Sequence, residues 1–338
     1  MVGAAQTQTE QHGHLPKCYE VVEEWRTGTL DTLKMLGESD ILAVKYASYL
    51  PTWHLLSVIR LMGVQANRAG PIAIEEMESR APFLPILATA LDEICTEAQL
   101  KGCRLWLDAE QQRLQPGLDN WAIELMRRHN KSATPLIYNT IQVYLKNSQN
   151  NVEQHIAAVR GEGWSLGVKL VRGAYIKHEN RDFIHDTKAD TDRSYDGIAE
   201  QLLCLHPGEQ VSLFLATHNA KSVERAVRLY RERMEKKSTV TAFECGQVQG
   251  MADELGCELI RANEDESAST TGEVRAPKTF KCLVWGTVGE CMGYLHRRAV
   301  ENTEAVERTT HMRDALVRET RRRFQFEVVP NFLKLKYR

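Results

Sequence analysis

The chain has 338 residues, of which 43% are hydrophobic and 26% are charged, and its formal net charge is −2. This length and composition are typical of a globular protein with one large core, and a single α/β barrel reaches this size. The nearly balanced charge excludes proteins that bind nucleic acid or an anionic membrane through a generally basic surface, so we expect no nucleic-acid partner.

The first residues, 1–17, are expected to form a disordered or poorly ordered lead-in. They contain neither the apolar stretch of a signal peptide nor the arginines typical of a mitochondrial presequence. His12, His14 and Cys18 have no fourth ligand nearby, so no metal site is expected. The next stretch, 18–36, is predicted to be a helix, and no apolar run of the chain is long enough to cross a bilayer.

Seven short apolar runs, rich in β-branched residues, are predicted to be strands. They cover residues 40–47, 104–109, 135–141, 166–173, 211–218, 239–246 and 281–286. Their hydrophobicity is nearly continuous, which is typical of strands covered on both faces, and amphipathic helical stretches separate them. The alternation predicts a parallel sheet, and seven βα units are typical of a closed (βα)8 barrel of the TIM type.

Two later segments depart from this alternation. Residues 261–278 are polar and rich in turn formers, which predicts a mobile surface loop. The Arg-rich stretch 317–324 is predicted to be a solvated helix end, and residues 326–338 follow it as a C-terminal tail. The barrel domain is therefore expected to span residues 18–325.

The cysteines of the chain favour an intracellular protein. There are eight of them, and no CxxC spacing occurs. Cys245 and Cys282 lie in apolar, strand-like runs. We expect the cysteines to be buried, reduced thiols.

Polar residues or glycines recur near the carboxyl ends of the predicted strands, where the active site of a parallel barrel forms. They are Lys45, Asp108, Asn139, Lys169 with Arg172, His218 with Asn219, and Glu244. Burying lysine and arginine in a barrel mouth requires anionic partners. Thr217, His218 and Asn219 also stand where the next helix begins, a position that favours phosphate. Together these residues predict a site for a large anionic cofactor with a smaller carboxylate beside it.

A further cationic site is predicted in the segment "GYLHRRAVEN", residues 293–302. Tyr294, Arg297, Arg298 and Glu301 follow helical spacing and so share one face. This stripe could be a solvated face with an Arg297–Glu301 pair. With a carboxylate ligand predicted elsewhere in the chain, the two adjacent guanidiniums become its candidate binding groups.

Seven motifs in this order resemble the proline dehydrogenase family, in particular its fungal members. They are "LDAE" (107–110), "TIQVYLK" (140–146), "KLVRGAY" (169–175), "TKADTDRSY" (187–195), "ATHN" (216–219), "GQVQGMADEL" (246–255) and "YLHRRAVEN" (294–302). The resemblance runs from about Lys45 to Asn302, and it implies a (βα)8 barrel that holds FAD without a covalent bond. It also implies oxidation of L-proline to 1-pyrroline-5-carboxylate, the first step of proline catabolism.

The resemblance assigns a role to each matching residue. The residues that match the substrate pocket and catalytic groups are Lys45, Asp108, Arg172, Tyr294, Arg297 and Arg298. The two adjacent arginines would bind the proline carboxylate, Tyr294 would cover the ring, and Lys45 with Asp108 would close the pocket. The residues that match the flavin contacts are Asp108, Gln142, Lys169, Arg172, Gly173, Ala174, Lys188, Thr217, His218, Asn219, Trp285 and Glu301. Arg172 would stabilise the reduced, anionic flavin.

The resemblance further implies hydride transfer to flavin N5, a quinone as electron acceptor, and a mitochondrial location with peripheral association to the inner membrane. Trp285 stands where many members have a tyrosine, Lys169 replaces an arginine of bacterial members, and Val248 stands where a leucine often lies. These differences leave open an enzyme for hydroxyproline or another cyclic imino acid. A truncated, non-catalytic relative is the third reading.

The first strand of the barrel is expected to be missing. Lys45 matches a residue of the family's second strand, the helix at 18–36 precedes it, and residues 1–16 contain no β-branched apolar run. We therefore predict seven strands, a gap between the strands at 40–47 and 281–286, and a shortened N-terminus. Such unpaired edges favour aggregation or weak flavin binding.

Overall fold

The computed structural model of the chain describes residues 6–45, 85–112, 114–177, 179–205, 210–236, 238, 241, 243–267, 277–289, 291–292, 295–296, 299 and 313–324. The chain divides into two compact units. Unit 1 comprises Met1–Ala216 and Glu224–Phe243, and unit 2 comprises Thr217–Val223 and Glu244–Arg338.

The described residues contain seven strands, which is the number predicted from the sequence. Five of them belong to unit 1, namely β1 (Ile41–Val44), β2 (Arg104–Leu107), β3 (Ile137–Gln142), β4 (Leu166–Val171) and β5 (Val211–Ala216). Each strand from β2 to β5 pairs in parallel with the strand before it, with Val44 opposite Leu107 and Gln142 opposite Val171. Parallel strands need long crossover connections, and helices supply them here.

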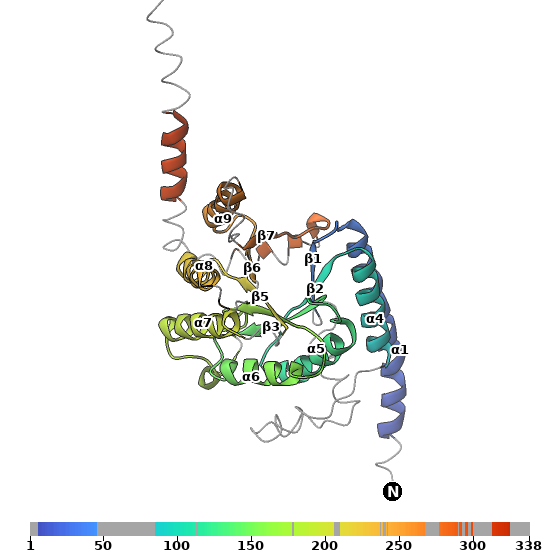
Figure 1. Cartoon of the computed structure of the whole chain (residues 1–338). Coiled ribbons are helices and arrows are strands. Elements are labelled where there is room, and N and C mark those ends of the chain that lie inside the picture. Colours follow the sequence, from blue (N-terminus) through green and yellow to red (C-terminus); the bar gives the residue numbers. More distant parts are fainter. Residues whose placement is uncertain are drawn as a thin grey trace, which may run out of the picture. The chain divides into compact units, whose positions relative to one another are not determined.

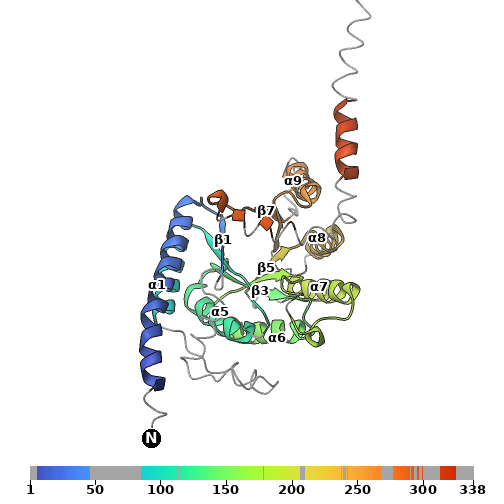
Figure 2. The ribbon, with the colours of Figure 1, turned by 180° about the vertical axis from the view of Figure 1, so that it is seen from behind.

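The helices of unit 1 lie around the outside of its strands (Figure 1). They are α1 (Gln6–Met35), α4 (Pro85–Leu100), α5 (Gln115–His129), α6 (Ser148–Val159), α7 (Lys188–Leu203) and most of α8 (Ala220–Glu235), together with the short 3-10 helix η1 (Arg181–Phe183). α1 lies along α4 in both views (Figures 1 and 2), where Arg26 Nη1 is 2.8 Å from Glu93 Oε2. Thr187 caps α7, and its side chain and that of Asp190 bond each other's backbone N–H in a capping box.

Two layers of contacts fill unit 1. On one face of the sheet, the ring centroids of Trp106 and Phe214 lie 4.4 Å apart, and this contact joins β2 to β5. Outside them, apolar faces of the helices cover the sheet, and Leu125 and Val168 have no exposed surface. β2 and β3 are almost wholly buried, as their predicted cover on both faces requires, whereas β1 is only partly buried.

Unit 2 contains β6 (Phe243–Val248, from Glu244 onward), β7 (Lys278–Cys282), α9 (Asp253–Ser267) and a helix at residues 313–324. β6 and β7 are parallel, and Val248 lies opposite Cys282. The strand predicted at 281–286 is wrong in its bounds, because β7 begins at Lys278 and ends at Cys282. Pairing ends at Cys282 because β6 ends at Val248, and Leu283 and Trp285 beyond it are exposed. β6 likewise begins at Phe243, later than the predicted start at residue 239.

Three other sequence-based boundaries are wrong. α1 begins at Gln6, so residues 6–17 are helical and not an unstructured lead-in. α9 continues to Ser267, so residues 261–267 are helical and not part of a loop. Residues 261–267 are Arg, Ala, Asn, Glu, Asp, Glu and Ser, a composition found in helices as well as in loops, so counting turn formers could not separate the two. The predicted loop also ends too late, because its last residue, Lys278, is the first residue of β7. Residues 268–276 of that loop and the tail 326–338 lie outside the described residues.

Seven cysteines of the described segments are free thiols, as predicted, but they are not all buried. Cys95 and Cys245 are buried, whereas Cys204 and Cys257 are exposed. Burial raises the pKa of the Cys95 thiol to about 12, with the charge of Asp92 adding to the effect. Cys204 lies directly after α7 and Cys257 lies on α9, and residue type alone does not encode which way such positions face.

We expect iodoacetamide to label Cys204 and Cys257 readily in the native protein, while Cys95 stays unlabelled. The thiolate is the reactive form, and burial both disfavours it and blocks access. Mass spectrometry of tryptic peptides would measure the modification at each position, with the protein in urea as the control in which every thiol reacts. Labelling of native Cys95 at the rate of Cys204 would contradict its burial.

Within the described residues, no helix has the length and hydrophobicity required to span a membrane. The same residues contain no cluster of three or more His, Cys, Asp or Glu that could hold a metal ion.

Candidate functional site

Asp108, directly after β2, lies between two lysines of unit 1. Its Oδ1 is 2.6 Å from Lys169 Nζ on β4, and its Oδ2 is 3.8 Å from Lys45 Nζ, just after β1. Lys169 is the tighter partner, and its side chain is only 11% exposed, against 42% for Lys45. The structure thus brings together three predicted site residues from three strands, and one carboxylate serves two cations.

Lys169 also lies over the indole of Trp106, with Nζ 4.6 Å from the ring centroid. This aromatic contact and the Asp108 carboxylate together compensate for the burial of the ammonium group. Nearby on the strands, Trp106 Nε1 and Thr140 Oγ1 are buried and have no hydrogen-bond partner among the described residues. Buried polar atoms without partners are rare in proteins, so these atoms indicate a place for a polar ligand.

Arg172 follows β4 and is held by Asp192 of α7. Arg172 Nε donates to Asp192 Oδ1 at 2.7 Å, and the guanidinium carbon lies 4.3 Å from the centroid of the Tyr195 ring. Lys188 Nζ is 2.5 Å from the other oxygen of Asp192. Partial burial raises the pKa of Asp192, but the hydrogen bonds from Lys188 and Arg172 outweigh it and keep the pKa below its ordinary value. Asp192 is therefore ionised at neutral pH and links two of the predicted flavin contacts.

The turn after Arg172 is shaped by β3 and the loop that follows it. Ala174 N donates to Gln142 Oε1 at 3.1 Å, and Tyr144 N donates to the carbonyl oxygen of Arg172 at 2.7 Å. Gly173 has φ of 143°, and a Cβ there would lie 1.6 Å from the Tyr144 ring. Only glycine fits, because both the backbone conformation and the space exclude a side chain.

In unit 2, the predicted residues Thr217, His218 and Asn219 are held by local hydrogen bonds. Asn219 N donates to Thr217 Oγ1 at 3.1 Å, and Thr217 N donates to the carbonyl oxygen of Gly246. His218 Nε2 accepts from Val248 N at 3.0 Å, so the ring carries its proton on Nδ1 when neutral. Trp285, predicted to contact the flavin, is 53% exposed.

Four predicted residues, Tyr294, Arg297, Arg298 and Glu301, lie outside the described residues. Their grouping on one helical face therefore stays a prediction.

Two polar residues predicted at the carboxyl ends of the strands lie elsewhere. Glu244 is the second residue of β6, opposite Lys278, and so lies at the start of that strand. Asn139 is buried, and its Nδ2 donates to Asp119 Oδ1 of α5 and contacts His155 Nε2 of α6. Side chains alternate along a strand, so Asn139 faces the helices whereas Thr140 and Gln142 face the other way. The strand's composition does not reveal this direction.

Sequence reasoning missed four residues that hold the turn Arg172–Tyr175. Glu110 and Tyr175 are hydrogen-bonded to each other. Tyr144 and Asp192 are both hydrogen-bonded to Arg172. All four fall within the motifs that carry the family resemblance, which is the signal that could have found them. Their partners are remote in sequence, so spacing alone does not assign these contacts.

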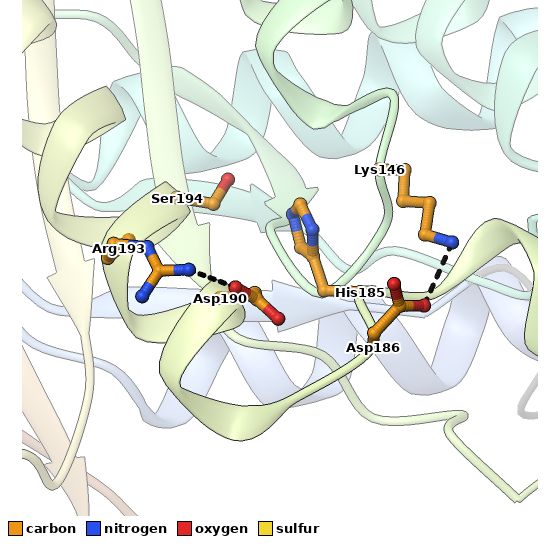
Figure 3. Close-up of a pocket in the computed structure, with 6 residues that line it drawn as sticks. All are labelled: Lys146, His185, Asp186, Asp190, Arg193 and Ser194. Carbon is orange, nitrogen blue, oxygen red and sulfur yellow. Dashed lines mark hydrogen bonds and ion pairs between the residues drawn. The ribbon is translucent and has the colours of Figure 1, made fainter.

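A separate shallow pocket lies beside the start of α7 and contains none of the predicted site residues. It is lined by Lys146, His185, Asp186, Asp190, Arg193 and Ser194 (Figure 3). Lys146 pairs with Asp186 at 3.1 Å, and Arg193 pairs with Asp190. Each cation thus faces an acid within the pocket, so the pocket offers no net charge to a ligand.

The residues of unit 1 fit a bound flavin in two respects. The unpartnered polar atoms of Trp106 and Thr140 match a ring system with polar edges. Arg172, beside the glycine turn, carries a positive charge that suits an anionic ligand. FAD has both a flat polar ring and anionic phosphates, which are the features these groups require.

Comparison with known proteins matches most of the chain to one family of enzymes. Residues 5–311 match the family model described as Proline dehydrogenase. A probable mitochondrial proline dehydrogenase of Schizosaccharomyces pombe is 33% identical over 249 residues, which make up 69% of this chain and 49% of that protein. A hydroxyproline dehydrogenase of Xenopus laevis is 33% identical over 245 residues, which make up 69% and 49%. The chain thus spans about half the length of these relatives.

Among solved structures, Proline Utilization A of Bradyrhizobium japonicum is similar, with a TM-score of 0.61 and 22% identity. The match covers 83% of this chain and 27% of that chain. At this identity the similarity shows the fold, which is the α/β barrel of the TIM type predicted from the strand and helix pattern.

Proposed function

Because this chain belongs to the proline dehydrogenase family, we propose that it oxidises L-proline to 1-pyrroline-5-carboxylate with FAD as cofactor. The observation that best supports the proposal is Asp108 held between Lys45 and Lys169, beside buried polar atoms that have no partner among the described residues. Charged groups of this kind are costly to keep inside a barrel unless a polar ligand uses them. The chain covers only part of its relatives, so activity is the property to test.

On the substrate side, Arg297 and Arg298 bind the proline carboxylate through paired hydrogen bonds, and Tyr294 covers the ring. Lys45 and Asp108 close the pocket as an ion pair, with Nζ and Oδ2 3.8 Å apart. These groups orient the ring and exclude water. Proline would react with its ring nitrogen unprotonated, that proton having passed to solvent before binding, so that the nitrogen lone pair assists departure of the hydride.

The cofactor is held by the residues that match the family's flavin contacts, namely Asp108, Gln142, Lys169, Arg172, Gly173, Ala174, Lys188, Thr217, His218, Asn219, Trp285 and Glu301. When bound, FAD would supply the hydride acceptor, its N5. Arg172 supplies positive charge next to the ring system, while Asp192 fixes its guanidinium in place. The protein thus contributes orientation and electrostatics, and the cofactor contributes the redox chemistry.

We further propose a quinone as electron acceptor and a mitochondrial location, with peripheral association to the inner membrane. The name of the Schizosaccharomyces pombe relative, which includes "mitochondrial", supports the location.

The decisive experiment is the absorption spectrum of the purified chain, followed by anaerobic titration with L-proline. We expect a yellow protein whose flavin absorbance bleaches as proline is added. Bleaching by hydroxyproline alone would favour the alternative substrate, which the Xenopus laevis relative supports. A folded, colourless protein that FAD cannot reconstitute would exclude both activities and favour a non-catalytic relative.

Arg297→Met and Arg298→Met are each expected to weaken proline binding by at least about tenfold while FAD stays bound. Losing one desolvated, charge-assisted partner typically costs about 2–5 kcal/mol. Anaerobic proline titrations would give the affinity, and flavin content per protein is the control. Equal loss of flavin and of substrate affinity would contradict their role as carboxylate ligands.

Arg172→Met and Asp192→Asn are expected to shift the flavin reduction potential in opposite directions. Removing the cation makes the reduced, negatively charged cofactor less stable, so the potential falls. Neutralising Asp192 removes a negative charge 2.7 Å from Arg172 Nε, so the potential rises. Potentiometric titration with a reference dye would measure both. Shifts of the same sign would show that Asp192 acts by placing Arg172 rather than by its charge.

A further inference from the structure

The turn that the proposed function assigns to the flavin, Arg172–Tyr175, is held by a carboxylate from another strand. Tyr175 donates its hydroxyl proton to Glu110 Oε2 at 2.7 Å, and Glu110 follows β2. Ala174, one residue earlier, donates its N–H to Gln142 at 3.1 Å. The turn after β4 is therefore fixed from the ends of β2 and β3.

These two anchors are also bonded to each other. Gln142 Nε2 donates to the carbonyl oxygen of Glu110 at 2.8 Å, and Glu110 and Gln142 are only 5% and 4% exposed. A buried carboxylate is stable only when hydrogen bonds satisfy it, so the Tyr175 hydroxyl has a strong partner in Glu110. The three strand ends form one connected unit.

The orientation of Glu110 is set from inside the protein. Its N–H donates to Gln115 Oε1 at 2.7 Å, and Gln115 Nε2 donates to Asp119 Oδ1, also at 2.7 Å. Asp119 is 7% exposed and also accepts from the side-chain amides of Asn139 and Asn151. A carboxylate only accepts, so Gln115 must face it with its NH₂ group, which leaves the Gln115 carbonyl for Glu110.

We propose that Glu110 is a positioning residue, which holds Tyr175, and through it the turn Arg172–Tyr175, in the conformation that receives the flavin. The role rests on the proposed function, because the ligand of the turn is FAD. Glu110 acts by accepting the hydrogen bond of the Tyr175 hydroxyl at its side-chain oxygen. This role does not require the negative charge of Glu110 to act on the flavin. The buried amides and carboxylate behind Glu110 make this conformation exist before the ligand arrives.

The test compares FAD dissociation constants, measured by flavin fluorescence quenching, for the whole chain and its variants. Glu110→Ala is expected to weaken FAD binding by at least about tenfold, because a buried hydrogen bond to a charged group is lost. Tyr175→Phe, which keeps the ring, changes the affinity in the same direction. Glu110→Gln stays within about threefold of the wild type, because its amide oxygen still accepts from Tyr175.

The visible circular dichroism of bound flavin at saturating FAD is the second measurement, since a change in stability alone would not alter it. Its signal should change in Glu110→Ala and Tyr175→Phe and return in Glu110→Gln. Tyr230→Phe is the matched control and should match the wild type, because the Tyr230 ring packs edge-on against Phe243 and belongs to no part of the turn.

Two results overturn the positioning role while leaving the proposed function intact. One is wild-type FAD affinity and dichroism in Glu110→Ala and Tyr175→Phe. The other is a Glu110→Gln variant as weak as Glu110→Ala, which would mean that the charge matters and not the hydrogen bond. A wild-type chain that binds no FAD overturns the proposed function and this inference together.

Discussion

Asn130→Asp is expected to lower the free energy of unfolding by about 3–5 kcal/mol, although it replaces one atom. Asn130 has no exposed surface, and its Nδ2 donates to the carbonyl oxygens of Ile137 at 2.9 Å and Ser165 at 2.8 Å. Its Oδ1 accepts from Ile137 N at 2.9 Å. A carboxylate cannot donate, so it would face two carbonyl oxygens at hydrogen-bond distance while buried.

Urea unfolding followed by circular dichroism would measure this loss, with Asn150→Asp on the exposed face of α6 as the matched control. The new carboxyl group has its pKa raised by burial in the folded state above the unfolded value. The variant therefore gains stability as the pH falls through the folded pKa, and its deficit should be smaller at about pH 5 than at about pH 8. If Asn130→Asp lost no more stability than Asn150→Asp at either pH, the role of Asn130 as a buried hydrogen-bond donor would be contradicted.

Gly173→Ala is expected to weaken FAD binding by about a hundredfold. The new Cβ would lie 1.6 Å from a carbon of the Tyr144 ring, and the φ of 143° is itself strained for alanine. Overpacking typically costs about 1–3 kcal/mol and a left-handed conformation about 1–2 kcal/mol, which together correspond to roughly this factor. The turn must move to relieve the overlap, and its Arg172 and Ala174 move with it.

Gly163→Ala separates backbone strain from overlap, because Gly163 has φ of 72° and a methyl group added there would meet no atom within 4 Å. It should lose some thermal stability and leave the FAD dissociation constant unchanged. Isothermal titration with FAD would measure both variants. If Gly173→Ala bound FAD as tightly as Gly163→Ala, the turn would not be part of the flavin site.

The strands of unit 1 were predictable because the central ones are covered on both faces, and every residue of β3 is buried. Boundaries failed where the deciding factor was a partner rather than composition. β7 stops at Cys282 because β6 offers no further backbone groups, although the sequence stays apolar to Trp285. α9 extends to Ser267 through residues whose polarity is equally typical of a loop.

The candidate site shows the same division. Lys45, Asp108 and Lys169 were found because ionisable residues at the ends of apolar runs are costly unless they are used. The family resemblance pairs Asp108 with Lys45, but the structure places Lys169 closer to Asp108. The sequence does not contain this information, because the nearer partner depends on the spacing between strands. Glu110 was missed because its partner Tyr175 is 65 positions away in the chain.

The strand order of unit 1 has a consequence for synthesis on the ribosome. Each strand from β2 to β5 pairs with the one made just before it, so no pairing waits for a distant part of the chain. Glu110 and Gln142 precede the turn that they hold, and Asp192 follows it by a short interval. A nascent chain that has emerged as far as Leu203 therefore already contains Glu110, Gln142 and Asp192, which bond the turn. This part can acquire its native geometry while the remainder is still being translated.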